Sequence, residues 1–224
     1  MSDQRAMAIS AEVRRSAWVA QSWLHTEALD ALAELNEQCL ELLIEQAAAC
    51  GARSRPAPLG GLEALWGGLD TATRRRAARC PFLLADAGFT RGCRPPWLRE
   101  RGVEDRDWPP VSATFFTVPR TVPVTRLVLA YAWHLARSES VAAQLFLGMS
   151  VRCVDSVAAC TLRQIILVAE NEPRLLRPRW PDRLEIWREL LAAASDGEPS
   201  AMERFRIRGL QLLAAEARAA DGQA

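Results

Sequence analysis

Residues 142–170 read AAQLFLGMSVRCVDSVAACTLRQIILVAE, and this stretch predicts three short helices joined by two tight corners. The first helix ends at Gly148, Ser150 is placed to cap the second, and Thr161 is placed to cap the third. Gln164 follows Thr161 by three residues, so its side chain can reach back to the Thr161 backbone N–H as in a capping box. Compact corners between short helices are typical of a helix-turn-helix unit.

A long helix is predicted near the start of the chain. No Gly or Pro occurs from Ser10 to Cys50, and leucines recur there at steps of three and four residues. This periodicity indicates one amphipathic helix that stops at Gly51, or two helices broken near His25 and Thr26.

Other helices are predicted on both sides of the cornered unit. Asp70 is placed to cap a helix over 71–80, and a strongly apolar helix is predicted over 124–137, where burial or pairing with another chain would cover its apolar sides. Pro181 suits the first position of a helix that ends at Asp196 and Gly197. Ser200 and Glu203 have capping-box spacing for a last helix that ends around Arg218, before a frayed tail.

The middle of the chain is rich in Gly and Pro. Residues 88–123 are therefore expected to form loops, held to the body by Trp97 and Trp108, with a short strand at 113–118. Residues 81–86, PFLLAD, are expected to form a strand or a buried loop. The predicted fold is mainly all-α, with a helical lobe over 1–118 that includes the Pro-rich segment and a helical lobe over 119–224.

Composition narrows the class of protein. The chain has 224 residues, is 50% hydrophobic and carries a formal charge of +1, whereas dedicated DNA-binding domains are usually more basic. Its two histidines lack zinc-ligand spacing to any cysteine, so no metal or other cofactor is expected. Cys39, Cys153 and Cys160 are expected to be buried thiols. With no apolar signal core and no run of about eighteen apolar residues, the predicted location is the cytoplasm, away from membranes.

Residues 124–170 resemble FlhD, a bacterial flagellar transcriptional regulator that works with FlhC. The likeness includes the helix over 124–137 and the pair Leu147–Gly148. It also includes Ala158, Ala159, Thr161, Leu162, Gln164, Ala169 and Glu170. The RPRW element over 177–180 occupies the position at which that family has a basic–aromatic turn. A weaker match continues to residue 212. The first 118 residues have no counterpart in that family.

The resemblance implies a homodimer that joins an FlhC-type subunit and binds promoter DNA. It places the helix over 124–137 at the dimer interface. The residues expected at this interface are Leu127, Leu129, Ala130, Trp133 and Leu145.

Arginines are the candidate contacts to nucleic acid. Arg163 and Gln164 lie in the first turn of the third short helix, where a recognition helix presents side chains to bases. The alternative is that Gln164 caps the helix and Arg163 is solvated. The other candidates for a contiguous basic face are Arg152, Arg174, Arg177, Arg179 and Arg183. For the four arginines from 174 to 183, the alternative is a solvated charged surface or salt bridges to nearby acids. A second run, Arg74, Arg75, Arg76 and Arg79, is expected to be a solvated face or to meet an acidic partner.

No sequence motif for catalysis is visible, and the protein is not expected to be an enzyme. The predicted function is that of a transcriptional regulator subunit resembling FlhD. The alternative is an adaptor or scaffold that keeps an FlhD-like dimer surface without binding DNA. Acidic residues that interrupt the arginine face would favour the adaptor.

Overall fold

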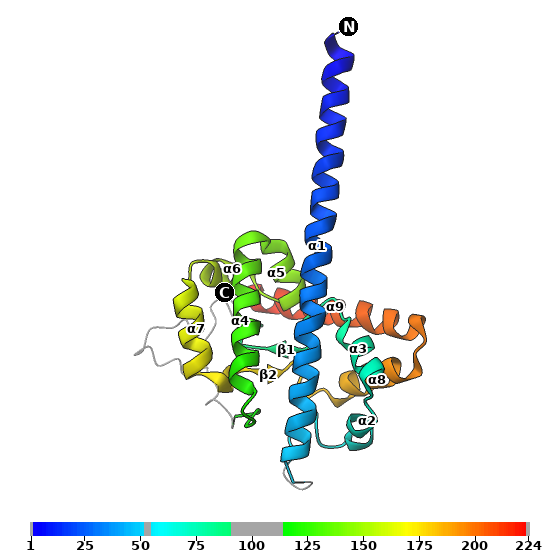
Figure 1. The fold of residues 1–224 in the computed structure, drawn as a ribbon, viewed down its shortest axis with the longest axis vertical. Coiled ribbons are helices and arrows are strands. Elements are labelled where there is room, and N and C mark those ends of the chain that lie inside the picture. The colour runs from blue at the N-terminus through cyan, green and yellow to red at the C-terminus, as the bar shows by residue number, and fades with distance from the viewer. Residues whose placement is uncertain (1, 52–54, 91–113, 223–224) are drawn as a thin grey trace.

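The computed structural model describes residues 2–51, 55–90 and 114–222, and most of these residues are helical (Figure 1). The prediction of a mainly α-helical fold is confirmed. The predicted loops around Trp97 and Trp108 lie outside the described residues. The elements, in chain order, are α1 (Ser2–Ala49), α2 (Glu63–Gly67), α3 (Thr71–Ala78), β1 (Ala85–Asp86), α4 (Thr121–Ser138), α5 (Ser140–Leu147), α6 (Val151–Ala158), α7 (Leu162–Asn171), η2 (Pro173–Leu175), β2 (Arg177–Pro178), α8 (Leu184–Asp196) and α9 (Pro199–Gly222).

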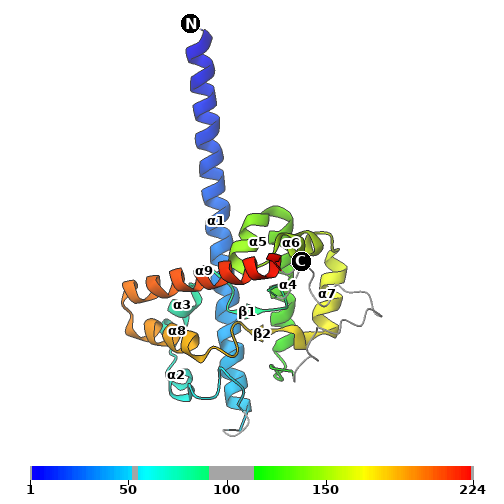
Figure 2. The ribbon, with the colours of Figure 1, turned by 180° about the vertical axis from the view of Figure 1, so that it is seen from behind.

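Helix α1 is continuous, so the alternative of a break near His25 and Thr26 is wrong. It begins at Ser2, earlier than the predicted Ser10. Its C-terminal half packs in the body of the molecule, whereas its N-terminal half stands clear of the other elements in both views (Figures 1 and 2).

The three cornered helices are α5, α6 and α7, and their predicted caps are confirmed. Gly148 ends α5 in the left-handed conformation, with φ 69°. The Ser150 hydroxyl accepts a hydrogen bond from the Cys153 N–H at the start of α6. Thr161 and Gln164 form the capping box of α7 in both directions. Each cap satisfies backbone donors that a helix end leaves open, which is why local sequence sets these corners.

Three predictions about other segments are wrong. Residues 114–118 form no strand; Phe115 and Phe116 instead turn into the core as an edge-to-face pair with centroids 4.7 Å apart. Helix α8 begins at Leu184 rather than Pro181, because the chain turns at Trp180, which has a φ of 50°. Helix α9 already includes residue 199, so Ser200 does not cap it, and it continues past residue 218 to residue 222.

Helix α3 joins α1 to α8 through its arginines. Asp70 caps α3 as predicted, accepting from the Thr73 N–H at 2.7 Å. Arg74 and Arg75 form ion pairs with acids of α1, and the Arg76 Nε donates to the Ala194 carbonyl near the end of α8 at 2.7 Å. Arg74 thus meets acids of the chain itself, whereas Arg75 and Arg79 are exposed, as expected for a solvated face.

The segment 80–85 runs through the centre of the molecule and is held from two sides. From α1, the buried Asn36 amide donates to the carbonyls of Ala78 and Phe82 and accepts from the Leu84 N–H. From the other side, the Arg179 backbone N–H donates to the Leu84 carbonyl at 2.8 Å. Side chains here supply the partners that a sheet would otherwise give to a buried extended backbone.

Residues on both sides of position 118 share one continuous core. Strand β1 pairs with β2 in antiparallel register, with Ala85 opposite Pro178. Trp187 of α8 packs against Trp66 of α2, with ring centroids 5.8 Å apart. Buried residues from both sides of position 118 therefore belong to one hydrophobic cluster.

Candidate interaction surfaces

The predicted basic cluster is divided between the surface and the core. Arg174 and Arg183 are exposed and Arg177 is half-buried, but Arg179 is only 2% exposed. The four side chains therefore do not form the contiguous face that their spacing in the sequence predicted.

Arg179 braces the core. Its guanidinium donates hydrogen bonds to the backbone carbonyls of Leu83 (2.6 Å), Ala85 (3.2 Å) and Leu147 (3.0 Å). Burial lowers the pKa of this guanidinium from its usual value, and the charges of Asp86 and Glu216 oppose that shift. A side chain committed to three buried carbonyls cannot reach a phosphate outside. The predicted contact of Arg179 with nucleic acid is thus incompatible with this structure.

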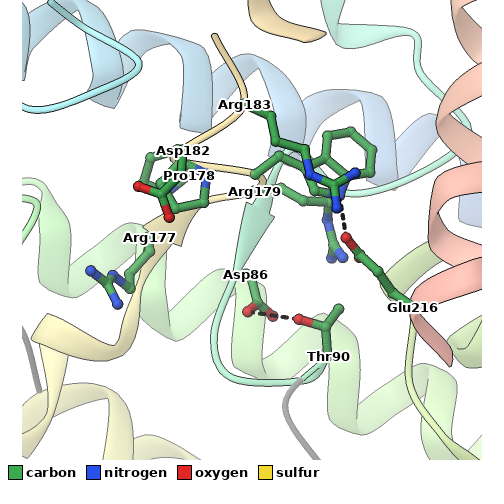
Figure 3. Close-up of a pocket in the computed structure, with 10 residues that line it drawn as sticks. Asp86, Thr90, Arg177, Pro178, Arg179, Asp182, Arg183 and Glu216 are labelled. Atoms are coloured by element: carbon green, nitrogen blue, oxygen red, sulfur yellow. Dashed lines mark hydrogen bonds between the residues drawn. The ribbon is translucent and has the colours of Figure 1, made fainter. Parts of the chain in front are cut away.

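A polar pocket of about 210 Å³ lies beside β2 (Figure 3). Arg177 and Asp182 extend along one side of it, and Arg183 and Glu216 lie on the other (Figure 3). Its charges are balanced, because the lining holds the arginines 177, 179 and 183 and the acids Asp86, Asp182 and Glu216.

The acids of this pocket have partners within the fold. The Trp180 indole N–H donates to a Glu216 carboxylate oxygen at 2.7 Å, and the Thr90 hydroxyl donates to Asp86 at 3.2 Å (Figure 3). The Phe89 backbone N–H donates to the same Asp86 carboxylate at 2.9 Å. These bonds tie α9 and the segment after β1 to the pocket. The arrangement stabilises the turn rather than concentrating positive charge.

Acidic side chains also interrupt the surface near this turn. Arg174 forms an ion pair with Glu172 at 2.9 Å. Arg126 of α4 does the same with Glu170 at the end of α7, at 2.7 Å. The basic surface predicted here is consequently broken by acids, which weakens attraction to a phosphate backbone.

The corner between α6 and α7 presents the other predicted DNA contacts. Arg152 and Arg163 are both exposed in the first turns of these helices. Gln164 is exposed too, but its side-chain oxygen accepts from the Thr161 N–H at 2.8 Å. Contact of that oxygen with a base would require the capping box to open.

A groove of about 610 Å³ between α1 and α4 contains part of the predicted dimer surface. Leu127 and Ala130 line its α4 side, and Leu127 is 50% exposed. This α1–α4 groove is completed by Tyr131 and His134 of α4 and, on the α1 side, by Ala31, Glu34, Leu35, Glu37 and Gln38.

The other predicted interface residues lie elsewhere. Leu129 is fully buried in the chain's own core, so it cannot contribute to a surface. Trp133 is half-buried and donates its indole N–H to the Cys160 carbonyl at 2.7 Å. Leu145 is 54% exposed and lines a different groove, of about 640 Å³, between α5 and α9, next to Ile207. The predicted set is thus split between two grooves and the core.

The α1 side of the α1–α4 groove was not predicted from the sequence. Ala31 and Leu35 are four residues apart in α1, and Glu34 and Glu37 lie beside them. The missed signal was the i, i+4 repeat of α1: Leu35 reaches the core and also lines the groove, and Ala31, one turn earlier, lies beside it.

Comparisons of the chain with models of protein families, with curated proteins and with solved structures found no match. Within residues 2–51, 55–90 and 114–222, no single helix is both long and apolar enough to cross a membrane. Helices α5 and α6 reach that length and composition only as a pair, and they are bent by 118°. No group of three or more metal-binding side chains occurs in the described part of the chain.

Proposed function

We propose that this protein is a self-associating interaction subunit of a larger assembly, and that a second copy of the chain covers its α1–α4 groove. The observation that carries the proposal is the apolar character of this groove. Leu127 is half exposed beside Ala130 in this groove, as Leu145 and Ile207 are in the groove between α5 and α9. A large exposed side chain in a groove of about 610 Å³ is typical of a surface that a partner covers.

The interrupted arginine face favours this function over DNA binding. Arg179 is buried, and Arg174 is paired with Glu172. Two of the arginines expected to contact phosphate therefore serve the fold or the local surface. The alternative predicted from the sequence, an adaptor, depends only on the dimer surface. The burial and pairing of these arginines therefore do not argue against it.

The proposal is tested by the mass of the full-length protein in solution. Sedimentation equilibrium should find a dimer, and Leu127→Glu should shift the particle towards the monomer, because the groove would have to bury a charge. The matched control is Leu167→Glu on α7, which is 46% exposed but lies outside the groove, and it should leave the dimer unchanged. A strictly monomeric wild-type protein would remove the proposal.

A promoter-binding subunit of FlhD type is the second candidate, favoured by one observation. The α6–α7 corner carries Arg152 and Arg163 on capped helix starts, and both are exposed. In helix-turn-helix proteins, side chains in these positions reach base edges and phosphates.

This second candidate is tested by gel shift of upstream flagellar DNA, with and without an FlhC-type partner. Arg163→Ala should weaken binding and reduce the salt slope by about one. Arg75→Ala serves as the control, since Arg75 is 70% exposed on α3, outside the corner. No shift in the presence of the partner would exclude promoter binding.

A further inference from the structure

The N-terminal arm, defined as residues 2–25 of α1, extends away from the body of the molecule. With 48 residues, α1 is about 70 Å long. It enters the core at Leu32, and just before this point the Ala28 carbonyl accepts a hydrogen bond from the Tyr131 hydroxyl at 2.8 Å. In the described part of the chain, no other element runs beside the arm in either view (Figures 1 and 2).

The arm is rich in apolar residues. One set of its apolar residues recurs at steps of three and four and continues into the body, while other apolar residues, including Trp18 and Trp23, fall outside this set. Because α1 is one uninterrupted helix, this spacing assigns the set to a single face. The positions are Ala6, Ile9, Val13, Ala17, Ala20 and Leu24, followed by Ala28, Ala31 and Leu35. A lone helix of this length is marginal in water, so tertiary or partner contacts are needed to stabilise it.

The face that the arm shares with the body leads into the α1–α4 groove. Ala31 and Leu35, the last positions of the stripe, line that groove. Leu127 of α4 forms the opposite wall. The apolar series of α1 thus begins in the arm and ends in the α1–α4 groove.

The charges at the two ends are complementary. The α1 side of the groove carries Glu34 and also Glu37, which already pairs with Arg74 and Arg75 of α3. The arm has three arginines, at positions 5, 14 and 15, against the acids at positions 3 and 12. Opposite charges at the two ends favour an arrangement in which the start of one helix lies on the groove of another.

We propose that two copies pair through α1 in antiparallel orientation, so that the arm of each copy lies on α1 of the other and its first turns occupy the α1–α4 groove. The pairing is reciprocal, and it therefore closes as a two-fold symmetric dimer and leaves no free arm. This inference rests on the proposed self-association and names the segment that performs it.

The test uses a photo-reactive benzoylphenylalanine at position 6 of the full-length protein. After irradiation of a mixture of isotopically light and heavy copies, mass spectrometry should find cross-links between copies, from position 6 to peptides containing residues 31–38 or 127–134. The matched control places the same probe at Ala8, which is two positions further along and on the opposite face of the helix. This control should give few such cross-links.

A second variant measures the contribution of the arm to dimerisation. Val13→Glu should raise the dissociation constant of the dimer at least about tenfold, as expected when a charge is placed in an apolar helix pair. Ser22→Glu, off the apolar stripe, should change it by less than about threefold.

The possible outcomes separate the two proposals. A dimer whose cross-links fall outside the groove overturns the arm inference and leaves self-association standing. A monomer in sedimentation overturns both. A monomer whose arm binds vesicles of anionic phospholipid assigns the arm to a membrane surface instead.

Discussion

Arg179 and Asn36 hold the same buried segment from opposite sides through hydrogen bonds to its backbone. Asn36 binds backbone groups on both sides of residue 80, and the Arg179 guanidinium binds the carbonyls of Leu83 and Ala85. A buried carbonyl without a partner costs about 1–3 kcal/mol, so each of these side chains prevents more than one such loss.

Arg179→Met is expected to lower the free energy of unfolding by about 3–5 kcal/mol, because methionine fills the space but donates no hydrogen bond. Urea denaturation measures the change. Arg183→Met, at an exposed position of the same turn, should stay within about 0.5 kcal/mol of the wild type. Equal stability of the two variants would mean that Arg179 does not brace the core.

The contribution of Asp70 to the free energy of unfolding is expected to depend on pH. Hydrogen bonds from the Thr73 backbone N–H and side chain lower the pKa of this carboxyl below its ordinary 3.8. A lowered pKa in the folded state means that the contribution is present near neutral pH and is lost as the pH falls through the folded-state value.

In Asp70→Asn the cap is retained but this titration is removed. The difference in unfolding free energy between wild type and variant should therefore shrink between about pH 5 and pH 2, as measured by urea denaturation at each pH. A difference that stays constant over this range would show that Asp70 does not titrate differently in the folded and unfolded states.

Among the helices, local signals set the corners and distant contacts set the other boundaries. Ser150, Thr161 and Gly148 could be identified from the sequence because a cap depends on residues only a few positions away. The start of α8 could not be identified, because the chain turns at Trp180 with a φ of 50°, and the indole of this residue is bonded to Glu216 of the distant helix α9. The positive φ at that tryptophan has no signature in the sequence.

The same distinction explains the candidate site. Arg177 and Arg179 are two positions apart and look alike in the sequence, yet only Arg179 is buried. The Arg179 side chain is held in the core by the carbonyls of Leu83 and Ala85, more than ninety residues earlier in the chain. Leu129 and Leu127 differ in the same way: one faces the core and the other the groove. Spacing predicted the apolar character of α4 but not which of its faces was already covered.

Two glycines that end helices offer a matched test of this packing. Gly148 and Gly197 have φ values of 69° and 77°, so alanine is strained at both positions. An added Cβ would meet nothing within 4 Å at Gly197, whereas at Gly148 it would lie 2.9 Å from a methyl group of Leu213.

Gly197→Ala is expected to cost about 1 kcal/mol and Gly148→Ala about 2–4 kcal/mol, the excess arising from overpacking between α5 and α9. Chemical denaturation followed by circular dichroism measures both values. Equal costs would show that Leu213 of α9 moves to accommodate the added methyl group without a further loss of stability.

At the scale of the molecule, the shared core predicts cooperative unfolding. Trp66 and Trp187 come from opposite sides of position 118 and pack together, and β1 and β2 do the same. Two separately folded lobes would instead lack such contacts.

Thermal unfolding should accordingly give one transition, with the calorimetric and van't Hoff enthalpies in agreement. Asn36→Ala should lower the midpoint of that transition without splitting it, because α1 contributes to the core of the whole chain. Two resolved transitions would contradict this prediction and would support a domain boundary near residue 118.

The bracing of segment 80–85 from both sides also has a consequence for synthesis on the ribosome. Asn36 is available before this segment emerges, but Arg179 is made more than ninety residues later. Until then the carbonyls of Leu83 and Ala85 lack their guanidinium partner. The hydrogen bonds that hold segment 80–85 can therefore form completely only after Arg179 has been synthesised. A product truncated before Arg179 would leave this segment accessible to proteases.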